Sequence, residues 1–318
     1  MFRHNLKFKM NLTLKTQPNI RPVKTLPPPQ HIVNNNIHNN YSRVYYLHNI
    51  YGLGDSVFNM IFINLIEERI IADNILFCYF TKNEYIQQLT QFIKPRLVNH
   101  VKLFSLDQIP AHSIELWINN SYFVYTFDCS LISSHFSVDY NDFYLNYFKH
   151  VLQILTINAN IQSIMYSDND LLVRANAIPP EYKPVDVLIL NSQPFSGQYN
   201  YNKCIWDKYI QHLNSNSSLK IVTTTKVEGV LCTFDQNMTI KDIAALSTQS
   251  KVVIAINSGV FPGLLNVHTM ESVKQFYIFD IHCYYSFPNF QKKDCITQIS
   301  IAELNYYATM SPCNDATV

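Results

Sequence analysis

Short apolar runs alternate with amphipathic segments along most of the chain, and this alternation indicates its architecture. The elements expected in the first half are strand 44–48, helix 57–66, strand 75–80, helix 84–92, strand 101–104 and a long helix over 139–157. Strands that alternate with helices in this way form βαβ units on a parallel sheet. The pattern therefore predicts an α/β unit in this half.

The same alternation resumes after a break. Pro179, Pro180 and Pro184 punctuate a polar stretch over 167–184, where we place an interdomain connection. The elements expected beyond it are strand 185–190, helix 206–213, strands 221–222 and 230–232, helix 240–246, strand 251–256, a helix starting at 262–266, and strand 277–279. We therefore expect two Rossmann-like domains, residues 41–175 and 176–318, that face each other across a cleft.

Residues 1–40 lack lasting periodicity. They hold six Lys or Arg and no Asp or Glu. Such a composition is typical of a disordered basic tail. A contact arm or a targeting peptide is the alternative.

Composition excludes several classes of protein. Apolar residues make up 47% of the chain and charged residues 15%, with a formal net charge of +1, so the body should be folded and nucleic acid is disfavoured as a partner. The apolar runs are shorter than the ~20 residues of a membrane helix. Seven scattered cysteines, without a C-x-x-C pair, predict buried thiols, a cytoplasmic location and no metal site.

Glycine is scarce, so its positions are informative. The chain has six glycines, whereas the usual ~7% would give about 22. Two lie in Gly52-Leu53-Gly54-Asp55, between an expected strand and helix, and two more lie in the loop 257–263.

The first glycine turn is a candidate site because ligands of open α/β sheets bind at the carboxyl ends of strands. Asp55 at the start of the helix can act as a general base, and Gly52, Gly54 and Ser56 can contact a substrate. Asp55 or Ser56 can also simply cap the helix. A dinucleotide site is disfavoured because the third glycine of its fingerprint is missing: Val57 stands at that place, and Phe58 and Asn59 follow it.

The loop after the late strand 251–256 is the second candidate. Its backbone N–H groups and the hydroxyl of Ser258 suit an anionic ligand such as a diphosphate. The residues expected to bind a donor there are Asn257, Ser258, Gly259 and Gly263, together with Ser192 from the loop 191–197. An ordinary strand-to-helix turn is the alternative for either loop.

The order of these motifs resembles the heptosyltransferase-like glycosyltransferases of family nine, which have the GT-B fold. The matching pieces are Gly52-Leu53-Gly54-Asp55, the capped helix from Thr239 to Leu246, and the strand and loop from Val252 to Gly259. The resemblance implies that Asp55 deprotonates an acceptor hydroxyl and that Ser258 and Gly259 hold the diphosphate of a nucleotide sugar. The family usually has Asp-Ser-Gly-Pro-x-His in this loop, whereas this chain has Asn257, Val260 and Pro262 at the three altered places.

The resemblance therefore predicts an inverting, metal-independent sugar transfer from a nucleotide-diphosphate donor, without a cofactor, to a glycan, lipid or protein acceptor. Another GT-B enzyme, such as a nucleotide-sugar epimerase, and a non-catalytic interaction protein are the alternatives. The sequence does not determine the oligomeric state.

The tail generates a first testable prediction. Deleting residues 1–40 should leave the cooperative thermal transition of the body in place, because the tail offers no periodic apolar face to a core. Calorimetry of the truncated and full-length chains checks this, and a collapse of the transition on truncation would contradict it.

Overall fold

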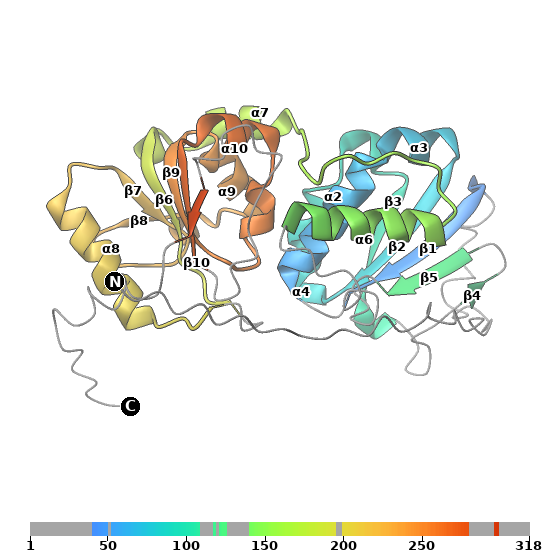
Figure 1. Cartoon of the computed structure of the whole chain (residues 1–318), viewed down its shortest axis with the longest axis horizontal. Helices are drawn as coiled ribbons and strands as arrows, with labels where there is room; N and C mark the ends of the chain where they lie inside the picture. Colours follow the sequence, from blue (N-terminus) through green and yellow to red (C-terminus); the bar gives the residue numbers. More distant parts are fainter. Residues whose placement is uncertain are drawn as a thin grey trace, which may run out of the picture.

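The computed structural model describes residues 40–49, 52–108, 117–118, 121–125, 140–194, 199–279 and 296–298. Residues 1–39 of the expected tail, residues 50–51 of the first turn and residues 195–197 of the third loop lie outside this range. Two sheets stand in separate halves of the molecule (Figure 1). The prediction of a mixed α/β protein with parallel sheets is thus confirmed.

The first sheet has five strands in the order β3-β2-β1-β5-β4. The strands are β1 (Arg43–His48), β2 (Ile75–Thr81), β3 (Val101–Ser105), β4 (Trp117–Ile118) and β5 (Ser121–Tyr125). All pairs are parallel except β4 with β5. The predicted strands 44–48, 75–80 and 101–104 therefore exist within one residue at each end.

Both faces of this sheet are covered. Tyr45 and Leu47 belong to one buried cluster, whereas Val44 and Tyr46, which point the opposite way along β1, belong to another. Every residue of β2 is buried. Central parallel strands that are buried on both sides need apolar residues at successive positions, which is why these strands appear as continuous apolar runs.

The second sheet has six strands in the order β11-β10-β9-β6-β7-β8, and all its pairs are parallel. The strands are β6 (Val185–Leu190), β7 (Ile221–Thr223), β8 (Leu231–Cys232), β9 (Ser250–Ile256), β10 (Gln275–Phe279) and β11 (Ile296–Gln298). Ile189 packs with Trp206 on one face, and Leu188 belongs to the cluster of Ala244 on the other. This arrangement is the doubly wound one that the alternation predicts.

The helices follow the predicted positions with three differences. The α-helices are α2 (Leu53–Leu65), α3 (Glu67–Ala72), α4 (Asn83–Thr90), α6 (Tyr140–Ile154), α7 (Asp170–Ala177), α8 (Lys203–Asn216), α9 (Ile240–Ser247) and α10 (Val267–Ser272). The predicted helix 57–66 begins earlier, at Leu53, and ends at Leu65, with α3 beyond it. The segment after β9 forms a 3₁₀ turn, η6 (Phe261–Leu264), before α10.

The third difference lies in the proline-marked stretch 167–184, which contains a helix. Arg174 bonds Asp170 one turn earlier at 2.7 Å, and Leu171 and Ala175 are buried, so α7 has both an i,i+4 pair and an apolar face. The expected boundary between residues 175 and 176 falls inside α7, and the division into domains stays a prediction.

The two halves are joined by packing. One buried cluster extends from Tyr45 and Phe92 of the first half to Ile240 and Phe276 of the second. The hydroxyl of Tyr166 donates to the carbonyl of Gly263 at 2.7 Å in the same region. This continuous core holds η6 against α9.

Side chains at the end of α4 and just beyond it also cap the start of α9. Gln88 Oε1 accepts the backbone N–H of Ile240 at 2.9 Å, and Gln91 Oε1 accepts the hydroxyl of Thr239 at 2.8 Å. Thr239 and Asp242 form the predicted capping box, which is confirmed. The hydrogen-bond donors at the start of α9 therefore bond partly to residues of the second half and partly to residues of the first half.

The packing of η6 against α9 generates the second prediction. A Cβ on Gly263 would lie 2.6 Å from Ile240 Cγ2, so Gly263→Ala should lower the free energy of unfolding by about 1 to 3 kcal/mol. Urea unfolding measures the loss. Gly52→Ala is the control, since its added Cβ would meet its nearest atom at 3.5 Å; an equal loss in both variants would contradict a specific overlap at Gly263.

Candidate functional site

The topology places the first glycine turn where an α/β sheet binds its ligands. The chain passes from β1 to β2 and β3 on one side and returns to the other side of β1 with β5. The loop after β1 therefore lies at the point where the strand order reverses, the usual place for a ligand in such sheets.

Asp55 bonds back to the beginning of α2. Gly52 is the residue that precedes the first helical turn, and its N–H donates to Asp55 Oδ2 at 3.1 Å. The prediction that Asp55 or Ser56 is the cap residue is therefore wrong: Asp55 acts from inside the first turn, at its third position. A carboxylate there also interacts favourably with the helix dipole.

A network of buried polar side chains lies below the turn. Asn59 donates to the carbonyl of Asp55 and to the hydroxyl of Tyr79, both at 3.0 Å. The hydroxyl of Ser56 bonds Thr81 at 3.2 Å and accepts from Asn49 at 3.4 Å. Ser56 is fully buried, so it supports the turn from below; its contact with a substrate stays a prediction.

Burial makes Asp55 a stronger base than an ordinary carboxylate. Desolvation raises its pKa to about 6, against the opposing effects of backbone N–H groups and of a hydrogen bond with Tyr144. Tyr79 beside it stays neutral, since burial raises its pKa to about 12. A carboxyl group of this kind is ionised above pH 6 and accepts a proton near neutrality.

The second sheet has its own reversal point, between β6 and β9. Ser192 follows β6, and Asn257 and Ser258 follow β9, so the two predicted donor loops leave neighbouring strands at the same edge. Asn257 is buried and its N–H donates to the carbonyl of Phe279 at 3.1 Å. The predicted donor residues are thus brought together by the strand order.

Asn191 holds this edge in shape. Its Oδ1 accepts the N–H groups of Thr224 at 3.1 Å and of Thr225 at 2.8 Å, which ties the end of β6 to the end of β7. The hydroxyl of Ser192 bonds that of Thr224 at 3.2 Å. Ser192 is therefore held at the end of β6 by a hydrogen bond between its hydroxyl and that of Thr224.

Ser258 has an unusual environment. Its side chain is 8% exposed, and its Oγ has no hydrogen-bond partner among the described residues. A buried hydroxyl without a partner costs about 1 to 3 kcal/mol, and such groups are rare in folded proteins. The hydroxyl of Ser258 is therefore free to donate to a ligand, although five other buried polar atoms of the described residues are also without a hydrogen-bond partner.

The two candidate loops touch each other through glycines. A Cβ on Gly54 would lie 3.1 Å from Gly259 Cα, and one on Gly259 would lie 3.2 Å from the backbone nitrogen of Gly54. Any side chain at either position would push the loops apart. Close packing therefore explains why glycine stands at positions 54, 259 and 263. The ligand contacts predicted for these glycines stay predictions.

Three residues of this site were absent from the sequence prediction. Asn59 lies one helical turn after Asp55 and could have been found from that spacing. Asn191 begins the predicted donor loop 191–197, although it was not among the residues expected to bind the donor. Tyr144 is separated from Asp55 by 89 residues, and no local pattern connects them.

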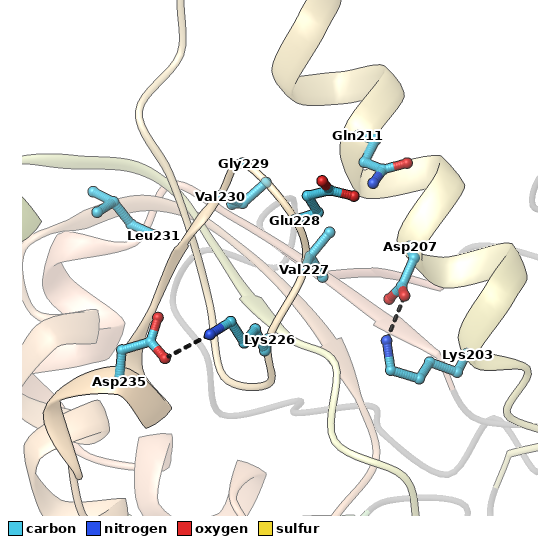
Figure 2. A pocket seen from close by; sticks show the side chains of 10 residues that line it. All are labelled: Lys203, Asp207, Gln211, Lys226, Val227, Glu228, Gly229, Val230, Leu231 and Asp235. Carbon is cyan, nitrogen blue, oxygen red and sulfur yellow. Dashed lines mark hydrogen bonds and ion pairs between the residues drawn. The ribbon is translucent and has the colours of Figure 1, made fainter.

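Figure 2 shows the residues of a hollow that lies away from the candidate site, between α8 and the loop before β8. Its volume is about 710 Å³. Lys203 pairs with Asp207, and Lys226 pairs with Asp235 at 3.7 Å. Glu228 is left as the excess charge among the lining residues. A negative lining disfavours a diphosphate, so the donor proposal rests on the Ser258 loop instead.

The cysteines differ in part from the prediction of free thiols. Cys78 and Cys232 are free and buried. Cys204 in α8 is disulfide-bonded. The prediction is wrong for Cys204, because cysteines far apart in sequence do not reveal which ones meet in the fold.

Membrane-spanning helices and metal-binding clusters are both absent from the described residues. None of the helices among them has the length and apolarity needed to cross a membrane. Within the same part of the chain, no group of three or more His, Cys, Asp or Glu side chains could hold a metal ion.

The chain is similar in structure to several known proteins, although its sequence alone matches none. No protein-family model matches the chain, and no curated protein matches it. Solved structures do: a glycosyl transferase family 9 protein from Veillonella parvula has a TM-score of 0.45 at 10% identity, over 85% of this chain and 97% of that one. E. coli heptosyltransferase WaaC with ADP has a TM-score of 0.48 at 10% identity, over 82% and 95%.

The dodecameric, iron-containing glycosyltransferase TibC from enterotoxigenic E. coli is also similar, with a TM-score of 0.43 at 11% identity, over 82% of this chain and 63% of TibC. Family nine is the family that the order of the sequence motifs resembles. The substrate and mechanism proposed below depend on the residues and contacts of this chain.

The third prediction follows from the raised pKa of Asp55. The folded chain holds the Asp55 proton more tightly than the unfolded chain, so stability from this group falls as pH rises from about 4 to about 6. Asp55→Asn removes the buried charge and should be more stable than the wild type above pH 6, by as much as about 3 kcal/mol.

This advantage should vanish below pH 4, where the carboxyl group is neutral in both states. Unfolding in urea from pH 3.5 to 8 measures the difference between the two proteins. A difference that does not change with pH would show that Asp55 titrates normally.

Proposed function

We propose that the chain is a glycosyltransferase that moves a sugar from a nucleotide-diphosphate donor to an acceptor hydroxyl. One observation carries this proposal: the glycine contact between Gly54 and Gly259 brings a carboxylate of raised pKa, Asp55, next to a loop with an unpaired buried hydroxyl, Ser258. The first suits a general base, and the second suits an oxyanion of a leaving group.

In the proposed reaction, Asp55 takes the proton of the acceptor hydroxyl. The acceptor oxygen forms a bond to the anomeric carbon while the bond from that carbon to the diphosphate oxygen breaks. Ser258 and the backbone N–H groups around Gly259 stabilise the charge that develops on the diphosphate. A single displacement inverts the configuration at the anomeric carbon.

The two halves divide the substrates in this proposal. Gly52 and Gly54 border the acceptor, and Ser192, Asn257, Ser258 and Gly259 border the donor, across a cleft between the halves. The reaction is proposed without a metal or other cofactor, because N–H and hydroxyl donors meet the diphosphate charge. Asn257 adds an amide where the resembled family has a carboxylate, which removes one negative charge beside the donor.

A carboxyl group with a strongly raised pKa at a loop of this kind is more typical of catalysis than of a passive scaffold. The acceptor is proposed to be a glycan, lipid or protein hydroxyl, and nucleic acid is not proposed as a partner. A cytoplasmic location also stays a proposal: the free Cys78 and Cys232 fit it, whereas the disulfide of Cys204 favours an oxidising compartment.

The fourth prediction tests the base. Asp55→Asn should lower the transfer rate by about 10² to 10⁴, because the amide cannot take a proton, while it can still accept the N–H of Gly52. Donor affinity should stay the same or rise, because the amide carries no negative charge to repel the diphosphate. Transfer assays with a panel of nucleotide sugars, and calorimetric titration of the corresponding nucleotide diphosphates, measure the two quantities.

Ser258→Ala is the matched control because it should show the opposite pattern, with weaker binding of the nucleotide diphosphate and an intact base. Transfer by Asp55→Asn at the wild-type rate would reduce Asp55 to a helix-capping residue. If no nucleotide diphosphate raises the melting temperature of the wild type, the donor assignment is wrong.

A further inference from the structure

Tyr144 contacts both the candidate base and the helix that carries it. It belongs to α6 and is 4% exposed. Its ring stacks on Phe58 of α2, with centroids 3.8 Å apart and planes 16° apart. A hydrogen bond with Tyr144 is one of the effects that lower the pKa of the Asp55 carboxyl group against the larger effect of its burial. One residue thus fixes the helix by its ring and the carboxyl group by its hydroxyl.

We propose that Tyr144 is a positioning residue, whose hydroxyl, together with the N–H of Gly52, holds the Asp55 carboxylate in one orientation and keeps it ionised. The proposal rests on the proposed function, in which Asp55 is the general base. A phenol hydroxyl donates to a carboxylate, and a hydrogen bond to an ionised group is stronger than one between neutral groups. A carboxylate with two fixed donors has less freedom to turn away from an acceptor.

The other described residues near Asp55 leave this role to Tyr144. Tyr79 of β2 is the other titratable side chain that interacts with Asp55, and it is neutral at physiological pH. Its hydroxyl accepts from Asn59, so it touches Asp55 only through the network. No Lys, Arg or His appears among the described groups that perturb Asp55. Tyr144 and Gly52 therefore counteract the desolvation that disfavours the charged form.

The experiment is a titration of Asp55 in the full-length chain, observed by carbon NMR of labelled aspartate and assigned with Asp55→Asn. In Tyr144→Phe the ring stack remains and the hydroxyl is lost, so the pKa of Asp55 should rise by about 1 from its value in the wild type. The acid limb of the pH profile of kcat/KM should move upward by the same amount.

Tyr45→Phe is the matched control. It also removes a buried tyrosine hydroxyl, one that donates to the carbonyl of Leu155 at 2.7 Å just beyond α6, but it does not touch Asp55. It should lower stability without moving the Asp55 titration. If Tyr144→Phe does not fold, 3-fluorotyrosine at position 144 provides a second test, since a more acidic phenol should lower the pKa of Asp55.

An Asp55 titration that is the same in the wild type and in Tyr144→Phe would overturn the proposal and leave Tyr144 as a core aromatic. The NMR result does not depend on turnover. If the pKa of Asp55 shifts in Tyr144→Phe but the wild type transfers no sugar, the contact is supported and the proposed function is rejected. If the wild type transfers sugar but the pKa of Asp55 does not shift in Tyr144→Phe, only the contact is rejected.

Discussion

The site depends on the contact between Gly54 and Gly259. Backbone atoms of the two loops approach so closely that a Cβ on either glycine would lie 3.1 to 3.2 Å from the other loop. The contact joins the first turn of α2, which carries Asp55, to the loop after β9, which carries Ser258. A larger residue at either glycine would require the two backbones to move apart by a few tenths of an ångström.

Packing elsewhere keeps this contact in place. Lys241 is buried and pairs with Asp168 at 2.8 Å and Asp170 at 2.9 Å, which binds α7 to α9. Arg174 extends the network to Asp242 and to Gln91, the residue that follows α4. Separating the buried Lys241 from its carboxylates would leave a buried charge unpaired, which is strongly unfavourable, so α7 and α9 resist moving apart. The positions of the two glycine segments thus depend on contacts between the halves of the molecule as well as on contacts within each half.

Most strands, most helices and the glycine turns could be predicted from the sequence because each leaves a local signal, whereas β4, β5 and β11 were not predicted. Apolar runs marked β1 and β6, and Thr239 with Asp242 marked the start of α9. Contacts between distant segments leave no such signal. The hydrogen bond from Tyr144 to Asp55 and the disulfide of Cys204 are of this kind. The helix α7 was obscured because prolines at 179 and 180 lie just beyond its end, where they stop a helix without preventing it.

The charges of the proposed reaction explain why Asp55 needs hydrogen-bond donors although burial already raises its pKa. A nucleotide diphosphate bound at Ser258 would bring negative charge close to the carboxylate and raise its pKa further. Without opposing donors, Asp55 would bind a proton at neutral pH whenever the donor was present, and it could not act as a base. The N–H of Gly52 and the hydroxyl of Tyr144 favour the ionised form in that state. Burial makes the carboxylate basic, and these two donors keep it available.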